Sequence, residues 1–294
     1  MGFYSPATIA NDAKRHGIKI LPIDVQRSDW FCALEELGDD DRRKYVGAFA
    51  VRMGLKYIKG LRRAIGETIA DARIADGLFL SEYDLRRRLT GIKKSELILL
   101  AKAGALNWTG EKRHRRAALW HAERAGQSVG PLFESLMETA DSAAPLQQMN
   151  TEERLVADYG TTGLTLGPHP MTYHRAAMET LGIIPAVSLS TRRDGTYTSI
   201  AGAVIARQRP GTAEGFIFLS LEDETGISNA IIHPELYERN RVAVTRGRFL
   251  RVDGILQNQD GVINVRAAAV HLLMLSDAAP RSHDFHLKFA VRGS

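Results

Sequence analysis

The chain has 294 residues, of which 44% are hydrophobic and 25% are charged, and its formal net charge is +5. These proportions are ordinary for globular proteins and exclude a disordered chain. The length allows two domains with separate cores. No apolar run of about 18 residues occurs, so we expect no membrane partner. The single cysteine, Cys32, cannot form an internal disulfide and is typical of the reducing cytoplasm, where we expect the protein to act.

Residues 1–40 are predicted to contain one helix followed by one short strand. Ser5 can cap the helix, Pro6 suits its first turn, and Gly17 lies where the helix should end. The alternating segment IKILPIDV, residues 18–25, then predicts a strand. One strand does not make a sheet, so we interpret this region as the end of a larger one.

Residues 41–125 have a helical pattern that glycines divide into short pieces. Ser81 is expected to cap a helix, with Asp84 three positions later, and Gly91 and Gly104 are expected to end helices. Two stretches, YIKGLRRAIGETI and RRLTGIKKSELILLAKAG, share a helix, a tight turn with glycine and a second helix. This repeated layout predicts a tandem helix-hairpin-helix domain.

The two predicted turns are rich in basic residues, and the stretch 42–63 contains no acidic residue. A glycine turn before a helix lets the backbone approach a phosphate, toward which the first amides of the helix point. We therefore expect this domain to grip duplex DNA by its backbone, without reading bases. The predicted contacts are Lys59, Gly60, Arg62, Arg63, Gly91, Lys93, Lys94, Arg113 and Arg115. The alternative is a pair of ordinary α-helical hairpins with a solvated basic face.

Residues 126–195 are interpreted as a connector that contains helices, because they include too many apolar residues to remain solvated. Helices are expected in PLFESLMETA, TEERLVADYG and MTYHRAAMETLG, with a loop over GTTGLTLGPHPM. The string QSVGPLF, residues 127–133, is a candidate sliding-clamp motif with unusual spacing. The alternative for this string is the packed start of a helix.

From residue 196 onward the apolar period changes to two. Five strand candidates follow one another over 196–275, with a short helix, PELYERN, between the third and the fourth. This order predicts an OB-fold, which is followed by a tail over 276–294. The sequence therefore predicts an α+β multidomain protein with a tandem helix-hairpin-helix helical domain followed by a C-terminal five-stranded OB-fold β-barrel.

Three neighbouring acids, Glu222, Asp223 and Glu224, lie between the second and third predicted strands, just before Gly226. They are candidates for a metal site or for the corner of a hairpin. Successive side chains of a strand point to opposite faces, so Glu222 and Asp223 are not expected to converge on one ion. We favour a turn from Asp223 to Gly226 with the glycine at positive φ, and we predict no catalytic and no metal-binding residue.

The fourth predicted strand carries basic residues and one aromatic residue. In a regular strand, Arg246 and Arg248 share one face, and Phe249 and Arg251 share the other. We name Arg246 and Arg248 as DNA contacts, and Phe249 as a candidate for stacking on an unpaired base. The alternative for Phe249 is a place in the barrel core.

Several short stretches of the sequence resemble stretches of one known protein family. The string MGFYSPATIANDAKRHG with PIDVQRSDW, then GLKYIKGL, LAKAGAL with RRAALW, DYGTTGLTLGPHPM, and FLSLEDETG with INVRA resemble the C-terminal part of the bacterial C-family DNA polymerases. The likeness covers nearly the whole chain and is greatest to the error-prone, damage-inducible branch. It implies the end of a fingers-like region over 1–40, a helix-hairpin-helix domain on the primer-template duplex, and an OB-fold near the single-stranded template.

The resemblance also implies a function. The chain would be the DNA-binding segment of an error-prone polymerase in translesion synthesis, DNA repair and replication, with other mutagenesis or replication proteins as further candidate partners. The family's phosphoesterase-like domain and its palm, with the metal-binding aspartates, have no counterpart in this sequence. We therefore predict no cofactor in this chain, with Mg²⁺ implied only for the missing catalytic part, and no polymerase activity of the chain alone.

Two other functions fit the same residues. OB-folds with corners like LEDETG also occur in the anticodon-binding domains of tRNA synthetases, so a freestanding nucleic-acid-binding module is the first alternative. A protein-interaction adaptor of a mutagenesis complex is the second. The helix-hairpin-helix pair favours DNA over tRNA.

Overall fold

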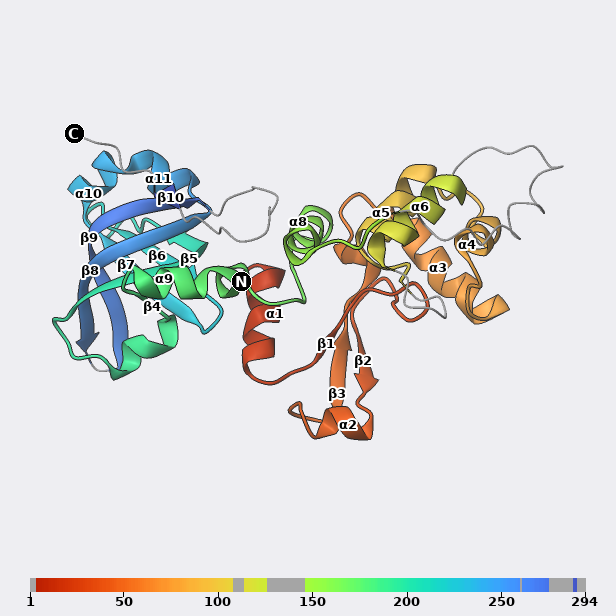
Figure 1. Ribbon diagram of the computed structural model, residues 1–294, viewed down its shortest axis with the longest axis horizontal. Coiled ribbons are helices and arrows are strands. Elements are labelled where there is room, and N and C mark those ends of the chain that lie inside the picture. The colour runs from red at the N-terminus through yellow and green to blue at the C-terminus, as the bar shows by residue number, and fades with distance from the viewer. Residues whose placement is uncertain (1–3, 108–113, 126–145, 260, 275–287, 290–294) are drawn as a thin grey trace. The chain divides into compact units, whose positions relative to one another are not determined.

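The computed structural model describes residues 4–107, 114–125, 146–259, 261–274 and 288–289. Their contacts form two compact units (Figure 1). One unit, the helical unit, runs from His16 to Gly167; the other, the barrel unit, combines the described residues up to Arg15 with those from Pro168 onward. The boundaries predicted at 40, 125 and 195 follow changes in composition, whereas the contacts place the first helix with the barrel.

The helical unit begins with a small three-stranded sheet in the order β1-β3-β2, in which β1 is parallel and β2 antiparallel to β3. The predicted strand over 18–25 is shorter than expected, and the other two strands of the sheet were missed because each has only four residues. The elements are β1 (Ile20–Leu21), β2 (Ala33–Glu36), α2 (Asp39–Arg42), β3 (Phe49–Arg52), η1 (Leu55–Tyr57), α3 (Arg63–Asp76), α4 (Glu82–Arg88), α5 (Lys94–Lys102), α6 (Arg115–Ala125) and α8 (Thr151–Thr161).

The ends of these helices follow the signals in the sequence. Ser81 caps α4, because its hydroxyl oxygen accepts a hydrogen bond from the Asp84 amide at 3.1 Å. Gly104 follows α5 with a φ of +79°, a conformation that glycine adopts without strain. Leucines from α4 and α5 fill the core of this unit, among them Leu85 and Leu97, which are fully buried.

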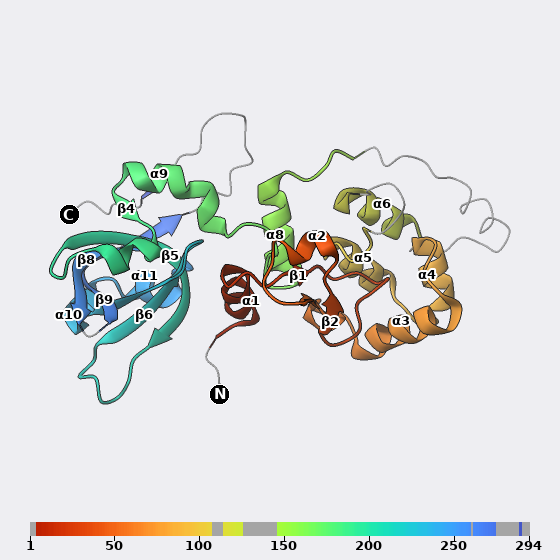
Figure 2. The same ribbon diagram turned by 90° about the horizontal axis from the view of Figure 1, so that it is seen from below.

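The barrel unit contains a closed ring of five strands: β5 pairs with β6, β6 with β7, β7 with β9, β9 with β8, and β8 with β5 (Figures 1 and 2). Only the pairing of β7 with β9 is parallel. This ring, with a helix after its third strand, confirms the predicted OB-fold. The strands are β5 (Tyr197–Gln208), β6 (Ile217–Glu222), β7 (Ile227–Ile232), β8 (Phe249–Gln259) and β9 (Val262–Met274).

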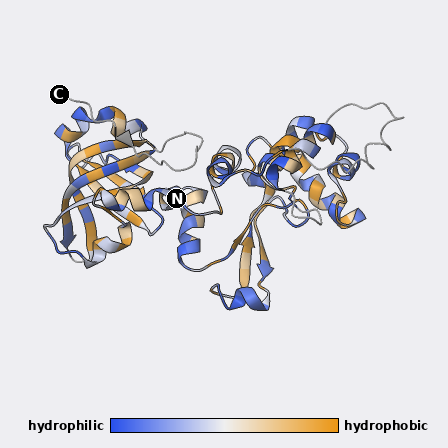
Figure 3. Ribbon diagram, in the orientation of Figure 1, coloured by the Kyte–Doolittle hydropathy of each residue, from blue (hydrophilic) through white to orange (hydrophobic). Residues whose placement is uncertain are grey.

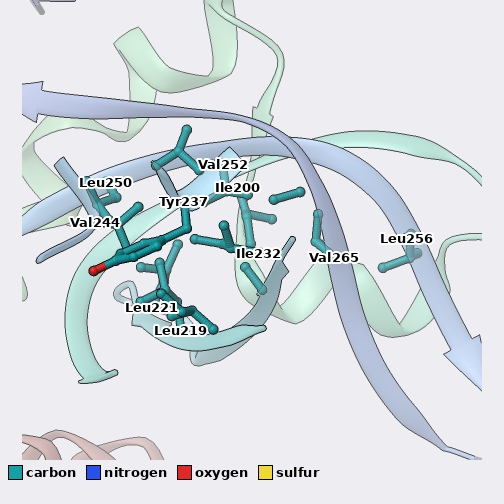
Figure 4. Packing of buried hydrophobic residues seen from close by; sticks show 14 of the residues in the cluster. Ile200, Leu219, Leu221, Ile232, Tyr237, Val244, Leu250, Val252, Leu256 and Val265 are labelled. Carbon is teal, nitrogen blue, oxygen red and sulfur yellow. The ribbon is translucent and has the colours of Figure 1, made fainter. Parts of the chain in front are cut away.

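Alternate residues of the ring form one apolar core, which includes Ile200, Leu219 and Val252 (Figure 4). Two helices after β7, α10 (Pro234–Arg239) and α11 (Arg241–Arg246), add Tyr237 and Val244 to this core. They lie at one end of the barrel strands (Figure 1). The sequence analysis predicted α10 and missed α11.

The strands of the ring come very close at Gly254 in β8. A Cβ atom there would lie 2.1 Å from the carbonyl oxygen of Arg266 in β9, beside a break in the pairing register. Only glycine fits such an approach without moving the backbone. The residue type is therefore fixed by packing and not by a ligand.

The remaining elements of the barrel unit pack beside the ring. Ser5 caps α1, since its hydroxyl oxygen accepts from the Thr8 amide at 3.2 Å, which confirms the predicted helix start. Within the described ranges, no helix combines the length and the apolar character needed to cross a bilayer. The flanking elements are α1 (Pro6–Arg15), η2 (Pro170–His174), α9 (Arg175–Thr180), β4 (Ile183–Ile184), η3 (Ala186–Thr191) and β10 (Lys288–Phe289).

Candidate nucleic-acid interface

The two predicted hairpin turns have the same backbone geometry. In the first turn the Leu61 amide donates to the Ile58 carbonyl at 3.2 Å, and in the second the Ile92 amide donates to the Leu89 carbonyl at 3.3 Å. The third residue of each turn is an exposed glycine, with a φ of +86° in the first turn and +93° in the second. A glycine at positive φ in this position is the mark of a type II turn.

Each of these glycines, Gly60 and Gly91, is followed three residues later by a helix start, α3 at Arg63 and α5 at Lys94. The hairpins therefore present their helix N-termini in the same way. They differ in the helix before the turn, because the first hairpin has only the three-residue η1 where the second has α4.

Arg62 joins the two hairpins. Its Nε donates to Glu96 Oε1 at 2.8 Å, and its Nη2 donates to Glu96 Oε2 and to the Gly91 carbonyl, both at 2.7 Å. The Glu96 carboxylate also accepts from the Lys93 amide at 2.9 Å. Glu96 is only 3% exposed, and its hydrogen bonds with Arg62 lower its pKa below the ordinary range. Arg62, predicted as a phosphate contact, thus holds the two turns together.

Two more predicted contacts form ion pairs on the surface. Arg63 Nε lies 2.8 Å from Glu67, one turn along α3, and Lys94 Nζ lies 2.7 Å from Glu123 of α6. Lys93 is exposed, and no acidic side chain of the described residues pairs with it. The charge available at the second turn is therefore smaller than the sequence indicates.

The last predicted contacts of the helical unit lie near α8. Lys59 Nζ donates to the Tyr159 carbonyl at 2.9 Å, close to the C-terminus of that helix, while the side chain remains exposed. Arg115 is mostly buried and pairs with Asp158 at 2.7 Å, so it stabilises the packing of α6 on α8. Arg113 and the candidate clamp motif over 127–133 lie outside the described residues.

The predicted place of Arg246 in the barrel was wrong. Arg246 is the last residue of α11, and Arg248 lies between this helix and β8. The error arose because the alternating sequence before Phe249 also suits a strand. Both arginines are exposed, and neither has an ion pair among the described residues. Phe249 is half-buried against Met171 and its apolar neighbours, which favours the core alternative over base stacking.

A row of side chains that the sequence analysis missed crosses the outer face of the barrel. Phe218 of β6 is 37% exposed and lies directly opposite Ile231 of β7, which is beside the exposed Arg266 of β9. This face of the second and third strands is the one with which OB-folds hold oligonucleotides. The alternation of Ile217 and Leu219, both buried, was the signal that Phe218 points outward.

The three acids lie at a hairpin corner, where two of them pair with an arginine. Arg175 pairs with Asp223 at 3.2 Å and with Glu224, and the Ala186 amide donates to Asp223 at 2.8 Å. The Asp223 amide donates to the Gly226 carbonyl at 2.9 Å, which closes the turn. One detail was wrong, because Gly226 does not have a positive φ. Asp223 and Glu222 are equally buried.

Glu222 ties α1 to the barrel, since it accepts from Asn11 Nδ2 at 3.2 Å and from Arg15 at 2.9 Å. Burial raises the pKa of Glu222 and lowers the pKa of the neighbouring His169 to about 4, so His169 is neutral at pH 7. These carboxylates face arginines and do not fit a Mg²⁺ site. Throughout the described ranges, no three His, Cys, Asp or Glu side chains are grouped to hold a metal ion.

Comparison with known proteins identifies both domains. A helix-hairpin-helix motif family matches residues 17–116, and an OB-fold nucleic acid binding domain family matches residues 198–273. Error-prone DNA polymerase 3 of Agrobacterium fabrum is 35% identical over 297 residues, covering 98% of this chain and 26% of that protein. The error-prone DNA polymerase of Anaeromyxobacter dehalogenans is 39% identical over 287 residues, covering 97% and 25%. The chain is a homologue of the C-terminal part of error-prone DNA polymerases.

The chain spans about a quarter of the length of the curated relatives that it matches. Among solved structures, asparaginyl-tRNA synthetase from Pyrococcus horikoshii, complexed with asparaginyl-adenylate, matches 31% of this chain and 22% of its own. Its sequence identity is 25% and its TM-score 0.27. So small a likeness carries no argument about function.

Proposed function

We propose that this chain is the DNA-binding segment of an error-prone DNA polymerase, which acts in the cytoplasm in translesion synthesis, DNA repair and replication. The observation that carries the proposal is the similarity of nearly the whole chain to error-prone DNA polymerases. The hairpin turns would hold the primer-template duplex, and the barrel would hold the single-stranded template. Polymerisation itself would take place in the part that this chain lacks.

In this proposal, the helical unit binds phosphates mainly through its backbone. The exposed turns at Gly60 and Gly91 let a phosphate approach the first amides of α3 and α5. Lys59 and Lys93 would add charge, whereas Arg62 would act indirectly by fixing the distance between the two turns. Contacts of this kind position the duplex and carry no sequence information.

On the barrel, the proposal assigns the single strand to the row of Phe218, Ile231 and Arg266. A base would stack on Phe218, while Arg266 and Arg248 would attract phosphates of the strand. Stacking of this kind tolerates any base, which suits a protein that copies many templates.

Equilibrium binding tests the proposal. Fluorescence anisotropy of labelled primer-template, blunt duplex, single strand and tRNA should show the tightest binding to primer-template. The Gly91→Ala variant should weaken duplex binding about fivefold, because strain of about 1 kcal/mol at positive φ distorts the turn. Gly47→Ala is a matched control in the same unit, since Gly47 also has a positive φ, of +87°, and open space around its Cβ position. Equal effects of the two variants would contradict the role of the turn.

The same titration separates the alternatives. Tighter binding to tRNA than to primer-template would indicate a tRNA-binding module, and no measurable affinity for any nucleic acid would indicate a protein adaptor. Primer extension with dNTPs and Mg²⁺ completes the test. We expect no product from the chain alone, since the family's metal-binding aspartates have no counterpart in it.

A further inference from the structure

The small sheet of the helical unit has one covered face and one open face. On the covered face, Ala50 and Arg52 of β3 are buried. On the open face, Phe49 of the same strand is 47% exposed, and Leu34 of β2 is 68% exposed. Figure 3 shows hydrophobic colour along much of β3, where a strand with one solvated face would alternate with polar residues.

The open face is a continuous apolar row across all three strands. Val51 of β3 lies directly between Leu34 of β2 and Ile20 of β1, and residues in such register share a face. Phe49 precedes Val51 by two positions and extends the same face. Single exposed apolar residues are common on soluble proteins, whereas an apolar row over a whole sheet marks a surface that another protein segment covers.

Polar residues surround this row in the manner of a protein interface. Glu36 is opposite Phe49 on β2, with a side chain that is 77% exposed, and Lys19, just before β1, pairs with Asp41. An apolar centre with a charged rim is typical of protein-protein contacts. It does not suit a phosphate backbone, because the rim residue beside Phe49 is an acid.

The length of the relatives indicates what covers this face. About three quarters of each matched polymerase has no counterpart in this chain, while nearly all of this chain has a counterpart in them. A segment of that size is long enough to form the separate cores that a polymerase requires. The open sheet also lies in the N-terminal part of the chain, next in sequence to the part of the relatives that is missing here.

We propose that the open face, formed by Ile20, Leu34, Phe49 and Val51, is the docking surface for this remaining polymerase portion. The inference rests on the proposed function. Leu34 and Phe49 insert into an apolar surface of the polymerase portion, and the contact fixes the hairpin turns relative to the catalytic site. The docking surface and the DNA-binding turns are separate sets of residues.

Protection from a thiol reagent tests the docking directly. The probe is the Anaeromyxobacter dehalogenans enzyme with its last quarter replaced by this chain, compared with the chain alone. In both proteins, Cys32 is changed to Ser and Leu34 is changed to Cys. The rate at which the thiol reagent labels residue 34 is then followed by mass spectrometry. We expect labelling at position 34 to be at least tenfold slower in the chimera than in the isolated chain.

The control is Leu80→Cys, which starts from a leucine of the same unit that is 78% exposed and lies just before α4. Its labelling should be equal in the two proteins. Equal labelling at position 34 in both proteins would overturn the proposal, as would protection of both positions. If the protection of position 34 in the isolated chain increases with protein concentration, a second copy of the chain covers this face. That result would also overturn the proposal. DNA affinity, measured on the same proteins, tests the proposed function separately.

Discussion

The arginines proposed to lie near DNA differ between the helical unit and the barrel unit. In the helical unit, arginines that the sequence marks as phosphate contacts pair with acids, as Arg62 does with Glu96 and Arg115 with Asp158. In the barrel unit, Arg248 and Arg266 are exposed, and no ion pair of theirs occurs among the described residues. Basic residues in a sequence therefore overestimate the charge that is available to DNA, because folding pairs some of them.

The buried acidic residues of the two units also have different roles. Glu96 joins two turns at the surface on which DNA is proposed to lie, so it acts on that surface. Glu222 and Asp223 lie inside the barrel unit and hold α1 and α9 against the ring. We expect the helical unit to bind DNA through a shaped backbone and the barrel to bind it through exposed side chains.

The largest expected effect is on the pH dependence of stability, which should differ between the two units. Burial lowers the pKa of His169 to about 4 from its ordinary value of 6.5. The unfolded chain therefore takes up a proton between those values while the folded chain does not, and the barrel loses stability as the pH falls from 6.5 to 4. The loss amounts to about 3 kcal/mol at about 1.4 kcal/mol for each pH unit. Hydrogen exchange of each unit between pH 7 and 4 measures it.

Two variants sharpen this comparison. His169 Nδ1 accepts a hydrogen bond from the Met171 amide, and the side-chain oxygen of His169→Asn can accept it instead, so this variant should remove most of the loss. Burial raises the pKa of Glu222, so the folded barrel takes up a proton there as the pH falls, and Glu222→Gln should enlarge the loss. In the helical unit, hydrogen bonds with Arg62 lower the pKa of Glu96, so its stabilising contribution is lost only as the pH falls below about 4.5. Equal loss of stability in both units at pH 5 would contradict this account.

The next effect concerns the link between the hairpins. Glu96→Ala should destabilise the helical unit by about 2 kcal/mol, because it removes a buried carboxylate that accepts several hydrogen bonds. Glu123→Ala removes the surface partner of Lys94 and should cost less than about 1 kcal/mol. Chemical denaturation gives both values. If the two variants lose the same stability, the ion pair between the hairpins is no more than a surface pair.

The smallest effect is on the salt dependence of binding. Four independent phosphate contacts at Lys59, Arg62, Lys93 and Lys94 would give a slope of log K against log salt of about −3 to −4 for duplex. Since Arg62 and Lys94 are paired, we expect a slope of about −2. A slope of about −4 in the parent that falls to about −3 in Arg62→Gln would show that the pairing does not limit the available charge.

A matched pair of arginines tests the same point for single strands. Arg266→Gln should reduce the size of the slope by about 0.7, because a free charge near one phosphate is lost. Arg115→Gln should leave the slope unchanged and lower the stability of the helical unit instead, since that arginine is already paired. A reduced slope for Arg115→Gln would place that residue on the DNA.

The sequence was sufficient where local chemistry determines the structure. Ser5 and Ser81 cap helices as expected, and Gly60 and Gly91 occupy turns of the expected kind. The five strands of the ring were found because one face of each is buried, which produces a period of two. Short or ambiguous segments were missed: β2 and β3 have four residues each, and α11 has an alternating sequence.

The sequence was insufficient where distant segments meet. Nothing in the residues around Arg62 shows that Glu96, 34 positions later, neutralises it, because the contact depends on how two hairpins pack. The same is true of Glu222, whose partner Arg15 is 207 positions away. Phe218, in contrast, could have been found, since the alternation of β6 already places it on the outer face.

Single-stranded DNA is proposed to lie across the outer face of the barrel, a claim that the affinity of Phe218→Ala for a labelled oligothymidine can test. The control is Tyr197→Ala, which removes another exposed aromatic ring of the same unit, 61% exposed at the start of β5. We predict that Phe218→Ala weakens binding about 5- to 150-fold, as expected for the loss of about 1 to 3 kcal/mol of base stacking, without a change in melting temperature. We predict no change for Tyr197→Ala. Unchanged affinity of a folded Phe218→Ala protein, or equal losses in the two variants, would contradict the claim.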